Sequence, residues 1–208
     1  AEEQPVLPKG NNLSLHLLEL FTSQVAKVGM TDGIRQVLQE ESDALRAYYE
    51  QAGILIARPA GGTSCRLAIS AKGGTNAENH NHNDVGSYAV ALGSETMVGD
   101  QGGPNSYPGD YFNGDAPQKY KIKGSFGHPV PVVDGRTQSS GGKAKGVVLQ
   151  KEFTNEKDVF SIDYTSAYST PNLDKLIRTF VYDRQGEGNF TVGDEFTAKT
   201  PIRFETAI

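Results

Sequence analysis

Short apolar runs with a two-residue period, separated by glycine-containing turns, fill the chain from Gly53 onward. Because strand side chains alternate between two faces, this period indicates half-buried β-strands. Many short strands between frequent turns are typical of an antiparallel sandwich or barrel, and the 24 glycines of the chain suit such turns. We therefore expect a mainly β fold, an antiparallel β-sandwich over residues 51–208. The expected strands are residues 54–56, 66–69, 88–92, 96–98, 130–133, 147–149, 159–162 and 177–182.

Residues 12–47 have the period of α-helices instead. Asn12 suits an N-cap and Gly29 a C-terminal cap. A second helix is expected to begin near Thr31 or Asp32 and to end before Gly53. Two amphipathic helices cannot bury their apolar stripes alone. Residues 1–50 are therefore expected to form a helical N-terminal segment that packs on the sandwich or on helices outside this chain.

The charge of the chain limits the classes of partner. The net charge is −5 and no segment is dense in Lys or Arg, which argues against nucleic acid as a partner. A local basic pocket could still bind an acidic sugar. Cys65 is the sole cysteine, so no internal disulfide can form, and we expect it to be a small buried residue. No apolar run is long enough for a membrane span, and the N-terminal residues do not have the pattern of a signal peptide.

Three of the four histidines lie in segments that suit a metal site. If residues 78–84 are extended, His80 and His82 point to the same side and could share a metal, or one could transfer protons. Asp100 follows on the return strand of an expected hairpin, and His128 precedes another expected strand. Two His and one Asp, with a fourth position for water, match a small divalent-metal site of zinc type. His16 lies within the first expected helix and is predicted to be structural.

Two alternatives stand beside this metal site. Histidines in such patterns often lie on solvated loops, so the residues alone leave both readings open. The run His-x-His-x-Asp at residues 80–84 also opens the metallo-β-lactamase signature of a binuclear hydrolase. That signature needs a further His directly after the Asp, where Val85 stands, and two more histidines downstream, where His128 alone remains. The sequence therefore disfavours the hydrolase.

The order of these motifs resembles a known family. Residues 71–74 (AKGG) precede the run HNHNDVGSY at 80–88, followed by VGDQGG at 98–103 and GHPVPVVDG at 127–135. This order is similar to that in the heparinase II/III-like family, which includes heparin, heparan and alginate lyases. The resemblance covers residues 53 to about 135 and is looser from there to residue 183.

The resemblance implies a set of metal ligands. In the family, the second histidine of the motif, the aspartate after the hairpin and the later histidine hold zinc or a similar divalent ion, which is mainly structural. The matching residues are His82, Asp100 and His128. Pro129 stands where the family commonly has Asn, which removes a backbone donor and leaves ligation by His128 possible.

The resemblance also implies catalytic roles. The first histidine of the motif, His80, is expected to face the substrate cleft and to take part in proton transfer. A tyrosine that follows the aspartate lines the same cleft, and either Tyr111 or Tyr107 could fill this role, with Tyr111 preferred. The implied reaction is β-elimination at a 4-linked uronic acid in an acidic polysaccharide.

The family places its substrate between an N-terminal α/α-toroid and the sandwich, and the toroid supplies the main catalytic groups. Two helices are too few for a toroid, so those of this chain would be its remnant or a connector. We therefore expect the isolated chain to be inactive and its parent to be a periplasmic or secreted lyase. The alternative is a non-catalytic carbohydrate-binding or structural β-sandwich.

Overall fold

The structure of the chain, a computed structural model, describes residues 44–99, 104 and 106–206. Residues 12–43 of the helical segment expected over residues 12–47 lie outside these ranges, as does Asp100. Within the described residues the chain is mainly β, and every strand pairing is antiparallel, which confirms the predicted class. No helix among them combines the length and apolarity needed to cross a bilayer.

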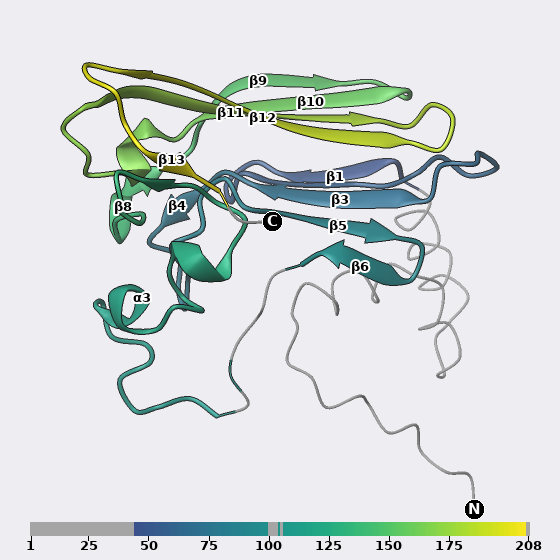
Figure 1. Cartoon of the computed structure of the whole chain (residues 1–208). Helices are drawn as coiled ribbons and strands as arrows, with labels where there is room; N and C mark the ends of the chain where they lie inside the picture. Colours follow the sequence, from purple (N-terminus) through teal and green to yellow (C-terminus); the bar gives the residue numbers. More distant parts are fainter. Residues whose placement is uncertain (1–43, 100–103, 105, 207–208) are drawn as a thin grey trace, which may run out of the picture.

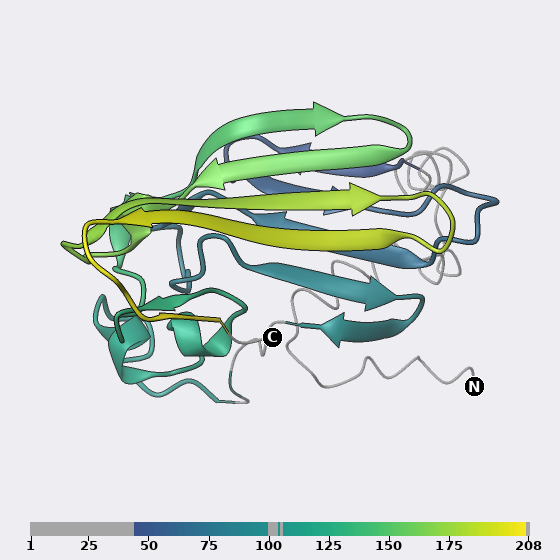
Figure 2. The same ribbon diagram turned by 45° about the horizontal axis from the view of Figure 1, so that its top comes forward.

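Two larger sheets face each other in the two views of Figures 1 and 2. The first has the order β1-β2-β3-β5-β6 and the second the order β12-β11-β10-β9. The first sheet consists of β1 (Arg46–Tyr49), β2 (Ile54–Ala57), β3 (Leu67–Lys72), β5 (Tyr88–Leu92) and β6 (Glu95–Val98). The second consists of β9 (Val147–Phe153), β10 (Lys157–Asp163), β11 (Leu173–Asp183) and β12 (Asn189–Ala198).

Smaller elements gather at one end of these sheets (Figure 1). Two short sheets pair β4 with β8 and β7 with β13. Three single helical turns complete the described chain. The elements are β4 (Thr75–Asn76), α3 (Ala116–Lys119), η2 (Ser125–Gly127), β7 (Val132–Val133), β8 (Gly141–Lys145), η3 (Thr165–Ala167) and β13 (Phe204–Glu205).

The prediction that helix continues to residue 47 is wrong at its end. Residues 46–49 form strand β1, which pairs with β2 from Arg46↔Ala57 to Tyr49↔Ile54. The turn between them ends at Gly53, whose φ is +63°, and a Cβ there would lie 2.5 Å from the Gly74 nitrogen. Tyr48 packs its ring against Phe153 and Phe160 of the facing sheet. This long-range packing outweighs the local helical pattern, as tertiary contacts often do.

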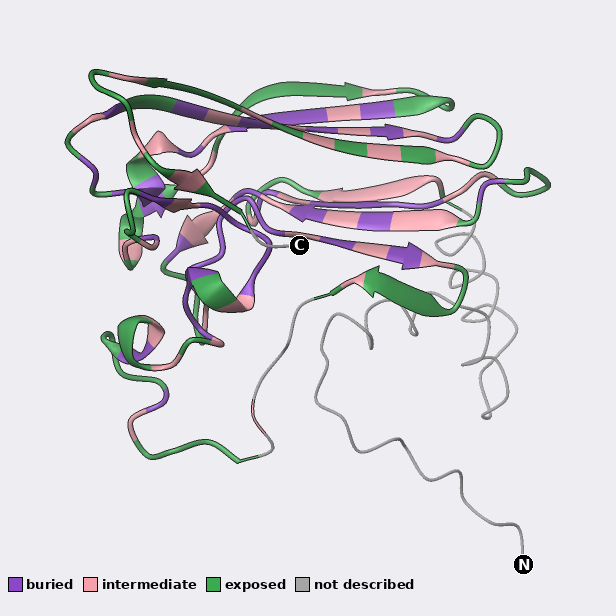
Figure 3. Ribbon diagram, in the orientation of Figure 1, coloured by how far each residue is buried: buried purple, intermediate pink, exposed green. Residues whose placement is uncertain are grey.

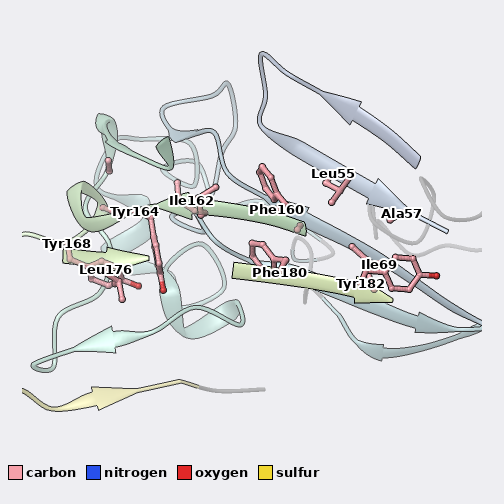
Figure 4. Packing of buried hydrophobic residues seen from close by; sticks show 14 of the residues in the cluster. Leu55, Ala57, Ile69, Phe160, Ile162, Tyr164, Tyr168, Leu176, Phe180 and Tyr182 are labelled. Carbon is pink, nitrogen blue, oxygen red and sulfur yellow. The ribbon is translucent and has the colours of Figure 1, made fainter. Parts of the chain in front are cut away.

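Buried residues of both large sheets belong to one hydrophobic cluster, and Figure 3 shows where the buried residues lie along the strands. The rings of Phe160 and Phe180 are stacked with centroids 6.0 Å apart, and Ile69 and Leu55 come from the first sheet (Figure 4). Each fully buried side chain of this size contributes about 1.5–3 kcal/mol to folding. Cys65 is buried as predicted.

Candidate functional site

The histidine-rich loop between β4 and β5, residues 77–87, is held by buried polar side chains. Asn83 is 1% exposed. Its side-chain nitrogen donates to the Gln138 carbonyl at 3.0 Å and to Ser140 Oγ at 3.1 Å. Its backbone N–H donates to the Lys123 carbonyl at 2.8 Å. Asn83 therefore fixes the backbone directly after His82.

Gln138 anchors the next residues of this loop. Its side chain accepts from the Val85 N–H at 3.0 Å and donates to the Val85 carbonyl at 2.7 Å. Gln138 Oε1 also accepts from Asn76 Nδ2 at 3.0 Å, and Asn76 Oδ1 accepts from the Asp84 N–H at 3.1 Å. Buried polar networks of this kind specify a single conformation when each member is satisfied. Neither Gln138 nor Asn76 could be predicted as a site residue from the sequence, because neither lies in a recognisable motif.

His82 and His128 come together although they are far apart in the sequence. His82 Nδ1 lies 3.1 Å from His128 Nε2, and the ring centroids are 5.0 Å apart. Two nitrogens bound tetrahedrally at about 2.05 Å from a zinc ion would be roughly 3.3 Å apart. His128 is 3% exposed and follows the helical turn η2. The distance between the two nitrogens is that of a hydrogen bond between the rings, and it is also close to the separation of two nitrogens bound to one zinc ion.

The rest of the predicted ligand set is outside the structure. Asp100 lies outside the described residues. Among the residues that are described, no group of three His, Cys, Asp or Glu side chains could hold a metal ion. Within the described residues, only two imidazole nitrogens are therefore available as metal donors at this place, and imidazole is a donor that zinc and related ions prefer.

His80 lies beside a cluster of aromatic rings. Its ring centroid is 4.3 Å from that of Phe112. Phe112 in turn contacts Tyr107 and Tyr111, with centroids 5.1 and 5.3 Å apart. Phe112 is 48% exposed and Tyr107 46%, whereas Tyr111 is 2% exposed. His80, Tyr107 and Phe112 thus form an exposed aromatic surface with Tyr111 buried beside it.

The premise that residues 78–84 are extended is wrong at His80. This residue has a φ of +58°, a left-handed conformation that few non-glycine residues adopt. Asn81 N–H donates to the Glu78 carbonyl at 3.2 Å, so the chain turns here. The alternation of strand side chains therefore does not apply here, and it no longer predicts that His80 and His82 point to the same side. Backbone strain of this kind is concentrated at functional sites.

Lys123 connects the histidine loop to the aromatic cluster. Its ammonium group donates to the Tyr111 carbonyl at 2.8 Å and lies 4.7 Å from the Tyr111 ring centroid and 5.2 Å from that of Phe112. Its own carbonyl accepts from Asn83. Burial lowers the pKa of the Lys123 ammonium group. Since lysine is rarely buried to this degree, at 3% exposure, the residue is a structural link between the two parts of the site.

Comparisons with known proteins show the fold. No protein-family model matches the sequence, and no curated protein is similar to it in sequence. Among solved structures, a mutant of the heparan sulfate lyase HepC from Pedobacter heparinus has a TM-score of 0.61 at 17% identity, covering 89% of this chain and 28% of that one. A structure of the heparan sulfate lyase HepC from Pedobacter heparinus gives 0.60 at 18% identity with the same coverage.

A heparinase III with methylated lysines has a TM-score of 0.57 at 14% identity, over 76% of this chain and 22% of that one. The chain therefore spans less than a third of the length of the lyases that it matches. The resemblance expected from the histidine motif is confirmed as a similarity of fold, over most of the chain, to one module of these larger proteins.

Proposed function

We propose that this chain is a β-sandwich module of a polysaccharide lyase, which contributes a metal site and part of the cleft for a uronic-acid-containing glycan. The observation that carries the proposal is the 3.1 Å approach of His82 Nδ1 to His128 Nε2, in a fold similar to that of heparan sulfate lyases. The glycan, the lyase activity of the whole protein and a periplasmic or secreted location are parts of the same proposal.

The proposed metal ligands are His82, His128 and Asp100, the third assigned from the sequence pattern alone. A zinc ion held there would join separate loops of the chain and add its binding free energy to the stability of the fold. His128 is buried, and Asn83, directly after His82, is held by two side-chain hydrogen bonds, so both imidazoles would meet the ion with little loss of conformational freedom.

His80 is the proposed proton-transfer group of this module. It is exposed, its backbone conformation is fixed by a tight turn, and Phe112 packs against its ring. In β-elimination a base removes the proton at C5 of the uronate and an acid protonates the departing oxygen. A neutral imidazole can do the first and a phenol the second. The exposure of Tyr107 favours it over the buried Tyr111 as the tyrosine that reaches the substrate.

The test uses the full-length protein that carries this chain, assayed with a panel of uronate polymers for the ultraviolet absorbance of unsaturated products. His80→Ala should lower kcat by about 10²–10⁴-fold, the range for a lost acid–base group, without loss of bound zinc. Full activity of this variant would refute the catalytic role. If no polymer is cleaved but the chain binds uronate oligosaccharides, the alternative of a non-catalytic carbohydrate-binding module would replace the enzyme.

A further inference from the structure

Arg178 of strand β11 joins the two histidine-bearing loops through one buried guanidinium group. Its Nη1 donates to the Gly86 carbonyl at 2.8 Å and to the Pro129 carbonyl at 2.7 Å. Gly86 is four residues after His82, and Pro129 directly follows His128. Both acceptors thus belong to the loops that carry the paired imidazoles.

The guanidinium group is itself held in place on its other side. Its Nε donates to Asp194 Oδ1 at 2.8 Å and its Nη2 to Asp194 Oδ2 at 2.6 Å. The hydroxyl of Tyr164 donates to the same carboxylate at 2.8 Å. Arg178 is 1% exposed. A guanidinium is planar and its donors have a fixed geometry. Because Asp194 holds Nε and Nη2, the direction of Nη1 is also set, and with it the positions of the two carbonyls that accept from Nη1.

We propose that Arg178 is a positioning residue for the metal site, which sets the distance between the loop of His82 and the loop of His128. This inference rests on the proposed metal site. A lysine could not replace the arginine, because a single ammonium group cannot keep the bidentate contact with Asp194 while it reaches both carbonyls. Pro129 can fill this role although proline has no backbone N–H, because Arg178 donates to its carbonyl.

The chain offers a matched control in Arg184, just beyond the end of β11. This residue is 3% exposed, forms an ion pair with Asp158, and donates to the carbonyls of Arg58 at 2.7 Å and Leu45 at 3.0 Å. Like Arg178 it is a buried guanidinium with one carboxylate and two carbonyl partners, although only its Nη2 reaches the carboxylate. Its two carbonyls belong to the segments next to β1 and β2 and not to the histidine loops. Loss of a buried arginine as such should affect both positions alike.

The test measures zinc affinity by competition with a chromophoric chelator, and the visible spectrum of the Co²⁺-substituted chain, for Arg178→Lys and Arg184→Lys. Circular dichroism gives the folded fraction of each. Arg178→Lys should weaken zinc binding by up to about 10–100-fold, the loss seen when a direct hydrogen-bond partner of a metal ligand is removed, and change the Co²⁺ bands. Arg184→Lys, corrected for its folded fraction, should bind zinc as the wild type does.

Equal zinc affinities for Arg178→Lys and the wild type would overturn the inference, as would an equal loss in both lysine variants. If Arg178→Lys does not fold, Tyr164→Phe is the second variant, since it removes one hydrogen bond to Asp194. It should weaken zinc binding several-fold, and an unchanged affinity would overturn the inference. A wild-type chain that binds no zinc would overturn the metal site together with the role of Arg178, whereas normal wild-type binding with unaffected variants would overturn that role alone.

Discussion

Replacing Gly86 with alanine should destabilise the loop that carries His82 by an amount that the structure allows to be worked out. Gly86 has a φ of +86°, and a left-handed conformation costs a residue with a Cβ about 1–2 kcal/mol. The added Cβ would lie 3.3 and 3.4 Å from two ring carbons of Tyr164. Because that ring is fully buried, moving it adds an overpacking cost of about 1–2 kcal/mol, at the lower end of the usual range.

The expected total is a loss of about 2–4 kcal/mol in the free energy of unfolding, or roughly 5–15 °C in Tm at about 2–4 °C per kcal/mol for a chain of this size. Urea denaturation of the chelator-treated protein, followed by circular dichroism, measures it. The matched control is Gly62→Ala, which has a φ of +76° but no atom within 4 Å of the added Cβ. Gly62→Ala should lose only the about 1–2 kcal/mol of stability that the left-handed backbone conformation costs. Equal losses in both variants would refute the contact with Tyr164, and an unchanged Gly86→Ala would refute the whole reasoning.

Three other predictions concern the core, the aromatic surface and alkaline pH. Phe160→Ala, at a fully buried ring between the sheets, should cost about 3–5 kcal/mol in urea denaturation, and a loss below 1 kcal/mol would contradict the packing described. Phe112→Ala should weaken binding of uronate oligosaccharides about tenfold in calorimetry, equivalent to about 1.4 kcal/mol, whereas Leu149→Ala, an equally exposed apolar truncation on strand β9, should not. Burial raises the pKa of the Tyr164 and Tyr182 phenols, so the folded chain keeps protons that the unfolded chain loses above about pH 10. The free energy of unfolding should therefore fall as the pH rises past this value, and an unchanged free energy in urea denaturation on either side of it would contradict this.

The strands could be predicted from sequence where local alternation and turns agree. Residues 88–92 and 159–162 are examples, because each is a short, mostly apolar run between turn residues. Strand β12 was not predicted, since its polar outward positions hide the alternation of Phe190 and Val192. Strand β1 was predicted as helix, because its pairing with β2 and the packing of Tyr48 depend on residues distant in sequence.

In the candidate site, too, the local features could be predicted from the sequence and the long-range ones could not. The motif around His82 is local and could be recognised, whereas the geometry that brings His128 to it is long-range and depends on the fold. One signal could have found Arg178. It occupies an inward position in the alternation of β11, between Leu176 and Phe180, and a charged residue at a core position is rarely there without a partner. Nothing in the sequence distinguishes buried Tyr111 from exposed Tyr107, because both lie in the same polar, glycine-rich loop.

The zinc content of this chain, purified without chelators and compared with three histidine variants, tests the central claim most directly. The wild type should hold about one zinc ion per chain, and His82→Ala and His128→Ala should lose it together with the zinc-dependent part of their thermal stability. His80→Ala should keep it, because its ring lies against Phe112. Full zinc content in His82→Ala and His128→Ala, or its loss in His80→Ala alone, would contradict the account.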